Sequence, residues 1–330
     1  MVNWLNYNIK YIPRILLITL FFSFNKSEFK WGFTAHKRIN RMAVFTLPNE
    51  QLFKLYKTNI EYLTEHAVDP DKRRYIIDNE APCHYFDADA YSNIDSVPHY
   101  WKNAIAKYGE DTLTKHGIAP WHIGLVKSKL QQAFEEKNLD NILKYSSDLG
   151  HYIGDIHVPL HTTKNYNGQL TNQIGIHGLW ESRLIDLHLS EYLLFTGKAK
   201  YIDNVSDFTW KIIKESHQLV DSVLMLERVI SQSDKILKYS YEVKGNTTQK
   251  VYSKEFSAKY HTLLNGMVQR RLISSIYAVG CLWYTAWVDA GQPNLELLNS
   301  FTISNEYKNE LKKLDEEYNF NKERGRSCLH

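Results

Sequence analysis

The chain has 330 residues, 43% of them hydrophobic, and carries 40 Lys and Arg against 37 Asp and Glu. This length and apolar fraction suit a large packed domain. The formal net charge is only +3 and there is no basic block, so nothing indicates nucleic-acid binding by electrostatics alone. Three cysteines without paired spacing, Cys83, Cys281 and Cys328, argue against a disulfide framework or a cysteine-rich zinc finger. Any metal site must therefore use histidines and carboxylates.

The N-terminal segment differs in character from the rest of the chain. Lys10 and Arg14 precede an apolar run, ILLITLFFSF, at residues 15–24, after which the sequence turns polar. A bilayer-spanning helix needs about 20 apolar residues, so this run is too short for one. The pattern predicts a secretory signal peptide over residues 1–30, and hence a secreted, periplasmic or extracellular protein. A buried N-terminal helix is the alternative.

Helical periodicity dominates the remaining sequence. Apolar residues recur at steps of three and four, for example at Leu52, Leu55, Tyr56 and Leu63, at Ile123, Val126, Leu130 and Phe134, and at Leu272, Ile276, Val279, Trp283 and Trp287. The last of these runs stops at Gly291 and Pro293, which commonly end helices. Runs with a period of two are scarce, and turn-forming residues mark loops at 81–93 and 162–175. The sequence therefore predicts an all-α protein.

The stretch HYIGDIHVPLH, residues 151–161, concentrates three of the fourteen histidines. Residues four apart share a face of a helix, so His151 and Asp155 are expected side by side. Pro159 ends the helix and leaves His161 just beyond it. Two ligands on a helix and a third on the following turn can converge on a metal ion.

A second pair at the same spacing, His177 and Glu181 in HGLWES, follows the predicted loop. One such pair alone is more often a surface hydrogen bond or a core histidine. Together with the preceding stretch it makes five zinc-compatible donors between residues 151 and 181, more than one tetrahedral site needs. The arithmetic predicts a cluster of more than one ion.

These two motifs resemble the zinc-dependent phospholipase C and single-strand-specific nuclease superfamily, whose members are all-α secreted enzymes with a three-zinc site. The family also uses a tryptophan at the mature N-terminus, a histidine shortly after it, and an Asp and a His about fifteen residues apart. WGFTAH offers Trp31 and His36, and VDPDKRRYIIDNEAPCH offers Asp69 and His84. The resemblance is direct over residues 31–184 and weaker over 265–290.

The resemblance implies a ligand set for three zinc ions. One ion would bind Asp69, His84, His151 and Asp155; a second would bind His161, His177 and Glu181; the third would bind the amine and carbonyl of Trp31 with His36, and share Asp155. An α-amino group has a pKa of about 7.7–8.0, so a freed amine can ligate near neutral pH. The third site requires cleavage after Lys30; otherwise Trp31 is a buried anchor.

The family pattern also implies roles beyond metal binding. Asp69 would orient the attacking water, as both ligand and base, for hydrolysis of a phosphate ester by a zinc-activated water. Lys72, Arg73 and Arg74 follow it, and one of them is expected to contact the substrate phosphate, the others forming a solvated basic turn. His157 has no ligand role in the pattern and is expected in the core or against a ligand.

The sequence leaves the substrate open between phospholipid and single-stranded nucleic acid. Glu181 and the sixteen-residue step from His161 to His177 favour a phospholipase C-like phosphodiesterase. Trp180 and the fifteen-residue step from Asp69 to His84 suit the nucleases, which makes a single-strand-specific endonuclease the alternative. A non-catalytic protein that holds zinc for structural reasons is the second alternative. No stable protein partner is implied.

The predicted organisation is a signal peptide at 1–30, a helical three-zinc hydrolase domain at 31–295, and a charged tail at 296–330. Part of the segment 190–260 is expected to be an insertion. The tail mixes charges of both signs and predicts a solvated helix that then frays.

Overall fold

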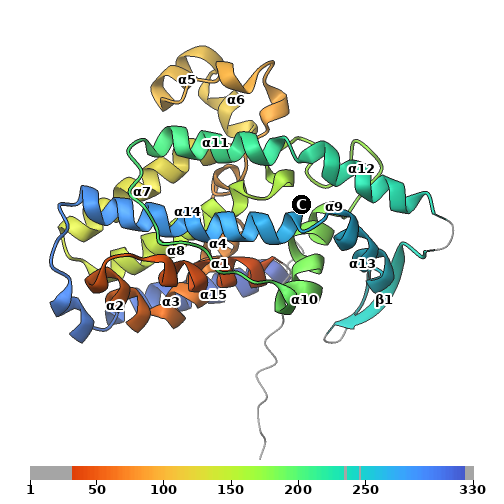
Figure 1. Ribbon diagram of the computed structural model, residues 1–330. Coiled ribbons are helices and arrows are strands. Elements are labelled where there is room, and N and C mark those ends of the chain that lie inside the picture. Colours follow the sequence, from red (N-terminus) through yellow and green to blue (C-terminus); the bar gives the residue numbers. More distant parts are fainter. Residues whose placement is uncertain (1–31, 234–235, 245–246, 324–330) are drawn as a thin grey trace, which may run out of the picture.

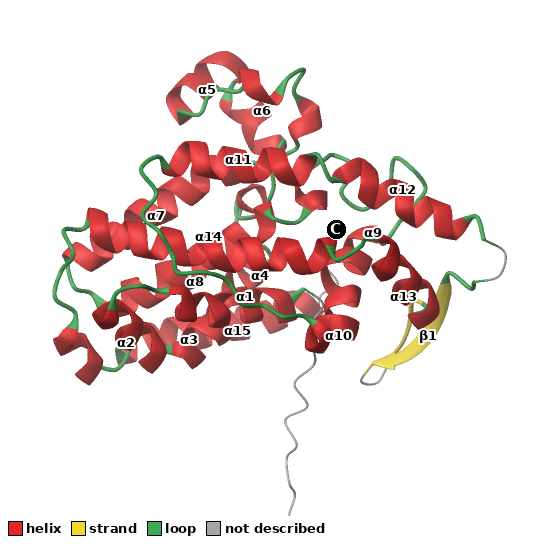
Figure 2. Cartoon of the chain, in the orientation of Figure 1, coloured by secondary structure: helices red, strands yellow, loops and turns green. Residues whose placement is uncertain are grey.

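A computed structural model describes residues 32–233, 236–244 and 247–323 (Figure 1). The predicted signal peptide and Trp31 lie outside the described residues. Helices make up most of what is described, and one two-stranded hairpin is its only sheet (Figure 2). The all-α prediction is confirmed in this sense. Among the described helices, none combines the length and apolar character needed to cross a membrane.

The helices of the first half are α1 (Phe33–Ala43), α2 (Glu50–Thr58), α3 (Ile60–Glu65), α4 (Asp69–Arg73), α5 (Trp101–Tyr108), α6 (Glu110–Lys115), α7 (Ala119–Glu135) and α8 (Leu139–Ile156). The second half contains α9 (Ile176–Gly178), α10 (Leu184–His188), α11 (Val205–His217), α12 (Val220–Ser231), the strands β1 (Tyr239–Lys244) and β2 (Thr247–Tyr252), α13 (Lys254–Leu263), α14 (Met267–Asp289) and α15 (Asn305–Glu323).

Helix α8 is the centre of the fold. It packs against α1, α7 and α14, and every residue from Ser146 to Ile156 is buried. The Asn138 side chain caps its first turn by accepting from the amide of Asn141 at 3.1 Å. The helix ends at Ile156, before Pro159, as predicted. Its buried C-terminal half therefore carries the first of the two histidine motifs into the interior.

Close approach of α1 to α8 depends on a small residue. A Cβ atom at Gly150 would lie 1.9 Å from Oδ1 of Asn40, so only glycine allows this contact. The amide of Asn40, fully buried on α1, donates to the carbonyls of Leu63 at 3.2 Å and Ser147 at 3.1 Å. This side chain ties α1 to α3 and α8 and brings the N-terminal helix against the centre of the molecule.

The predicted long helix near the C-terminus is α14, which contains all five apolar residues of the periodic run. It begins after Gly266, whose φ of 73° is left-handed, and ends before Gly291, whose φ is 80°. Trp283 is fully buried, and its indole donates to the carbonyl of Ser146 on α8 at 2.9 Å. Trp287 is buried as well, so both tryptophans of this helix are core residues.

The segment 190–260 contributes α11, α12 and the hairpin, in which Tyr239 lies opposite Tyr252. Two ion pairs attach the hairpin to the rest of the chain. Lys238 contacts the fully buried Glu227 of α12 at 2.7 Å, and Arg183 holds both carboxylate oxygens of Glu242, at 2.9 and 2.5 Å.

The tail forms a helix, but α15 is not simply solvated. It packs on α4, where Lys72 contacts Asp315 at 2.8 Å and the ring of Tyr75 meets the edge of Tyr318 at 5.3 Å. Tyr307 and Tyr318 are buried. The charge pattern of the tail does not predict these contacts. Two aromatic residues among many charged ones are enough to dock the helix.

Candidate metal centre

Seven of the predicted ligands converge inside the helical body, and six of them are buried, His177 being half-buried. They come from α1, from short 3-10 turns at Ala81–His84 and Pro159–Thr162, from α8, and from α9 with the π-helical turn that follows it: His36, His84, His151, Asp155, His161, His177 and Glu181. Segments far apart in the chain thus supply one cluster.

The donors form overlapping groups, in each of which one ligand atom per residue lies within 4.8 Å of the others. The groups are His84, His151 and Asp155; His161, His177 and Glu181; and His36, Asp155 and Glu181. Asp155 belongs to the first and third groups, and Glu181 to the second and third. The cluster is therefore continuous, and its two central carboxylates face two groups each.

Hydrogen bonds to the main chain fix the orientation of three rings. In each the Nδ1 atom donates to a carbonyl: His151 to Ala67 at 2.8 Å, His161 to His84 at 2.7 Å, and His177 to Tyr166 at 3.3 Å. A proton held on Nδ1 leaves the lone pair on Nε2, the atom that faces the carboxylates. Protein ligands to metals are commonly oriented in this way.

The second histidine motif is shaped by local backbone geometry. Gly175, with a left-handed φ of 94°, starts α9, and a π-helical turn at Leu179–Arg183 follows directly. π-Turns often occur at functional sites because they redirect side chains within a helix. Here Nε2 of His177 lies 2.6 Å from Oε2 of Glu181, the shortest contact between a histidine and a carboxylate of the cluster that the structure describes.

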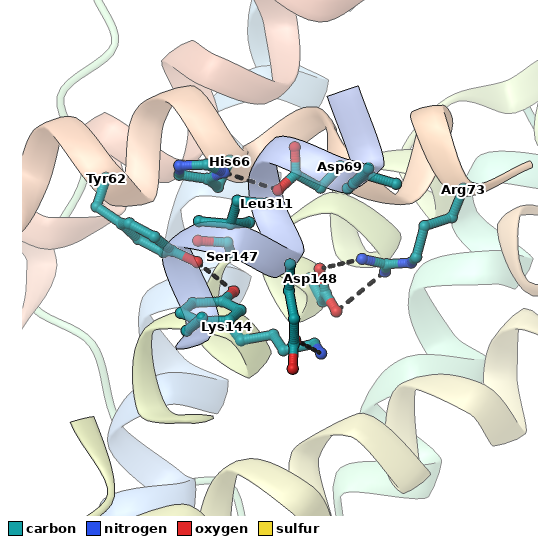
Figure 3. Close-up of a pocket in the computed structure, with 11 residues that line it drawn as sticks. Tyr62, His66, Asp69, Arg73, Lys144, Ser147, Asp148 and Leu311 are labelled. Atoms are coloured by element: carbon teal, nitrogen blue, oxygen red, sulfur yellow. Dashed lines mark hydrogen bonds and ion pairs between the residues drawn. The ribbon is translucent and has the colours of Figure 1, made fainter. Parts of the chain in front are cut away.

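Asp69 does not lie with the other predicted ligands. Its carboxylate accepts from His66 Nδ1 and from Lys72 Nζ, both at 2.7 Å. It borders a cavity of about 140 Å³ beneath α15, together with Tyr62 and Asp148 (Figure 3). The assignment of Asp69 as ligand and water-orienting base is therefore corrected.

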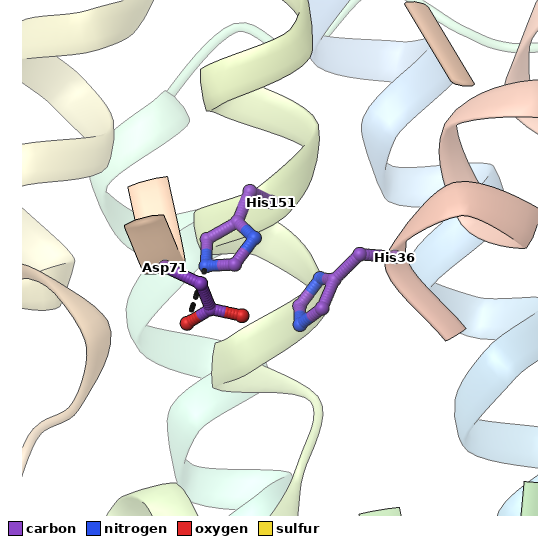
Figure 4. A group of neighbouring side chains, drawn as sticks. All are labelled: His36, Asp71 and His151. Atoms are coloured by element: carbon purple, nitrogen blue, oxygen red, sulfur yellow. Dashed lines mark ion pairs between the residues drawn. The ribbon is translucent and has the colours of Figure 1, made fainter. Parts of the chain in front are cut away.

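Asp71 occupies the expected place instead. Its Oδ1 atom lies 3.7 Å from His151 Nε2 and 3.8 Å from His84 Nδ1, and it forms a further group with His36 and His151 (Figure 4). Residues two apart on a helix differ by about 200°, so Asp69 and Asp71 face opposite ways. The motif DPD contains both carboxylates, and only the orientation of α4 determines which of them faces the cluster.

Two of the three candidate phosphate-binding residues are paired elsewhere. Lys72 contacts Asp69 and, at 2.8 Å, Asp315 of the C-terminal helix. Arg73 lies 3.0 Å from the buried Asp148. Both side chains are paired with carboxylates outside the candidate ligand groups, and their charges stabilise the packing of α4. The structure does not bring them to the candidate centre.

Arg74 is the one basic residue of the three beside the cluster. Its Nη1 atom lies 3.7 Å from Oδ1 of Asp71, and its buried Nε has no hydrogen-bond partner among the described residues. A guanidinium with unused donors next to a candidate metal centre is suited to binding an anion.

Electrostatics in the cluster balance burial against opposite charge. Burial lowers the pKa of His36 and His161, but Asp155 and Glu181 outweigh it and raise these pKa values to about 10 and about 9. Burial would raise the pKa of both carboxylates, yet the surrounding histidines hold it well below the usual range. For His151 burial dominates and the pKa is lowered. Metal binding at such donors must displace protons.

His157, the middle histidine of the first motif, lies in the core. Its Nδ1 donates to the carbonyl of Ile153 at 2.7 Å, and its own carbonyl accepts from Arg271 at 3.0 Å. Burial and the nearby guanidinium lower its pKa to about 3, so it is neutral. The expectation of a core role is confirmed. Trp180 is also buried, with 3% of its surface exposed.

Comparison with known proteins adds no family to this description. No protein-family model matches the chain, and no curated protein matches it significantly. The function must therefore be inferred from the chemistry of the cluster itself.

Proposed function

We propose that this protein is a zinc-dependent phosphoester hydrolase, and that its natural substrate is a phosphodiester of the kind cleaved by phospholipase C. The observation that carries the proposal is the convergence of imidazole and carboxylate donors in one buried cluster, with three rings oriented by main-chain carbonyls. Imidazole nitrogen and carboxylate oxygen are the donors that zinc accepts most readily in the absence of cysteine.

The donor set divides into three zinc sites. Asp71, His84, His151 and Asp155 would hold one ion; His161, His177 and Glu181 a second; and His36, with Asp155 and Glu181, a third, to which Trp31 is the further predicted ligand. Eight described donors exceed what one tetrahedral ion uses. This division supports a multi-ion centre over a single structural site.

Bound zinc supplies Lewis acidity and activates water for attack on phosphorus at neutral pH. The protein's own contribution comes from the residues at the open side of the cluster. The Asp71 side chain is 22% exposed, whereas those of Asp155 and Glu181 are 2% and 11% exposed. Asp71 is therefore the carboxylate best able to accept a proton from an attacking water. Arg74 beside it would donate to a non-bridging phosphate oxygen.

Two observations favour the lipid substrate. With Asp71 in place of Asp69, the step to His84 is thirteen residues (84 minus 71), so the nuclease-like step of fifteen disappears. Trp180 is buried and cannot stack on a base. Neither the Asp-to-His step nor Trp180 therefore supports a nuclease any longer.

A single-strand-specific endonuclease is the second candidate. It is favoured by Tyr166, whose ring lies edge-on to that of His177 at 6.4 Å, on the loop bordering the cluster. An aromatic ring beside the reacting phosphate is the usual platform for stacking an unpaired base.

The deciding experiment compares turnover of phosphatidylcholine vesicles with turnover of single-stranded RNA and DNA, with and without a chelator. We expect chelator-sensitive release of phosphocholine and restoration of activity by zinc. Cleavage of nucleic acid alone would replace the lipid proposal with the endonuclease. Tight zinc with no turnover of any phosphoester would identify a structural zinc protein. Comparing the full chain with one that begins at Trp31 tests whether a free Trp31 amine completes the third site.

A further inference from the structure

His84 differs from the other oriented histidines of the cluster in what its second nitrogen meets. Its Nδ1 faces inward, 2.9 Å from Asp155 Oδ2 and 3.0 Å from His151 Nε2. Its Nε2 is buried and makes no hydrogen bond within the described structure. The polar atom facing Nε2 is not a carbonyl but Oε1 of Glu80, at 3.7 Å. The rings of His151, His161 and His177 use main-chain carbonyls for this purpose, whereas His84 has a carboxylate.

Glu80 is held in this position from two further sides. Tyr152 donates its hydroxyl to Oε1 at 2.5 Å, and Nε of Arg73 lies 3.5 Å from the same atom. Arg73 in turn is held by Asp148 at 3.0 Å, and only 9% of the Glu80 surface is exposed. The carboxylate is therefore largely shielded from solvent and is held in a fixed direction toward His84.

We propose that Glu80 is a positioning residue for the metal centre, which holds the proton of His84 on Nε2 and so presents Nδ1 as the ligand atom. The inference rests on the proposed function, because it requires that the cluster binds zinc. A carboxylate behind a ligating histidine fixes the tautomer, orients the ring and raises the basicity of the ligand atom. Changing such partners typically costs 10–100-fold in metal affinity.

A purely structural role for Glu80 would be to balance the charge of Arg73. Asp148 already contacts Arg73 at 3.0 Å, closer than the 3.5 Å to Glu80. Glu80, unlike Asp148, forms an ion pair with a candidate ligand, His84. The two roles differ in their consequence: charge balance affects folding stability, whereas positioning affects one metal site specifically.

The test uses Glu80→Gln in the full chain, with Glu227→Gln as a matched control. Glu227 is another buried, ion-paired carboxylate, on α12, and it belongs to none of the candidate ligand groups. Zinc stoichiometry and affinity are measured by competition with a chromophoric chelator, and Co²⁺ substitution reports the ligand field by absorption. We expect Glu80→Gln to weaken one ion by about 10–100-fold and to change the Co²⁺ spectrum, and Glu80→Asp to recover part of the loss. Glu227→Gln should change neither.

Wild-type affinity for every ion in a folded Glu80→Gln protein would overturn the inference while leaving the proposed function intact. Absence of zinc binding in the wild-type protein would overturn both. If Glu80→Gln does not fold, Tyr152→Phe keeps the carboxylate but removes the hydroxyl that orients it. That variant should show a smaller loss at the same ion, and unchanged affinity in it would equally refute the positioning role.

Discussion

Two aspartates two residues apart on α4 should respond to substitution in opposite ways. Asp71→Asn removes a carboxylate that lies 3.7 Å from His151 and 3.8 Å from His84, and hence the proposed ligand and proton acceptor. Asp69→Asn removes a carboxylate on the other face of the helix, whose ion pairs among the described residues are with His66 and Lys72. Asp71→Asn should abolish activity with little effect on folding stability. Asp69→Asn should lower folding stability and leave activity largely intact.

The magnitudes follow from burial and contacts. Asp71 is partly exposed, and its ion pair with Arg74 at 3.7 Å is worth about 0–1 kcal/mol, so the metal-free protein should keep its stability. Loss of a general base costs roughly 10²–10⁴-fold in turnover. The Asp69 side chain is only 5% exposed and accepts two short bonds from ionisable groups, so its loss should cost about 1–3 kcal/mol of unfolding free energy.

The assay pairs zinc content after dialysis and phosphodiester turnover with urea unfolding in the presence of a chelator. We expect Asp71→Asn to lose bound zinc and at least about 10²-fold in turnover. Asp69→Asn should keep its zinc and remain within about tenfold of wild-type turnover, because it removes no interaction made with the transition state. The opposite pattern, with Asp69→Asn inactive and metal-depleted and Asp71→Asn active, would refute the assignment.

Three further predictions follow from the cluster. His151→Ala should abolish both zinc retention and activity, and a mutant that is active and fully zinc-loaded would contradict the ligand assignment. In the metal-free protein the pKa values of His36 and His161 are about 10 and about 9, above the unfolded value of about 6.5, so their contribution to stability is full below about pH 6.5 and is lost as pH rises through 9–10. The cluster's carboxylates, with lowered pKa values, contribute above about pH 4 and lose this as pH falls. The pKa values of the buried His151 and His157 are also lowered, so their contribution to stability is full above about pH 6.5 and is lost as pH falls below it. Unfolding with chelator should therefore show maximal stability at about pH 6.5, and a steady rise from pH 6 to 9 would rule this out. Gly154→Ala would place a Cβ 2.9 Å from Nδ1 of His36, so we expect a displaced ring, weaker zinc binding and a loss of about 1–3 kcal/mol of unfolding free energy. Gly124→Ala, whose Cβ would have nothing within 4 Å, should instead stabilise the protein by roughly 0.5–1 kcal/mol. Equal effects at the two glycines would contradict the close approach of His36 to Gly154.

Local periodicity was enough to predict the helical class and the two core ligand motifs. His151 and Asp155 share a helical face at any position in any fold, and Pro159 must end that helix, since both follow from bonds within one segment. The same holds for α14, whose apolar spacing and flanking glycines are local signals. Such features need no knowledge of what the segment packs against.

Only the tertiary structure decided between Asp69 and Asp71, because the rotation of the short helix α4 is set by its neighbours. Helix α15 packs against one side of the α4 segment, where Lys72 contacts Asp315 and Tyr75 contacts Tyr318. With that side packed against α15, Asp71 faces the cluster. Glu80 likewise gave no signal in sequence, since its partners come from distant segments. A five-residue helix has too few bonds of its own to fix its direction, so packing across the chain determined which carboxylate faces the candidate metal centre.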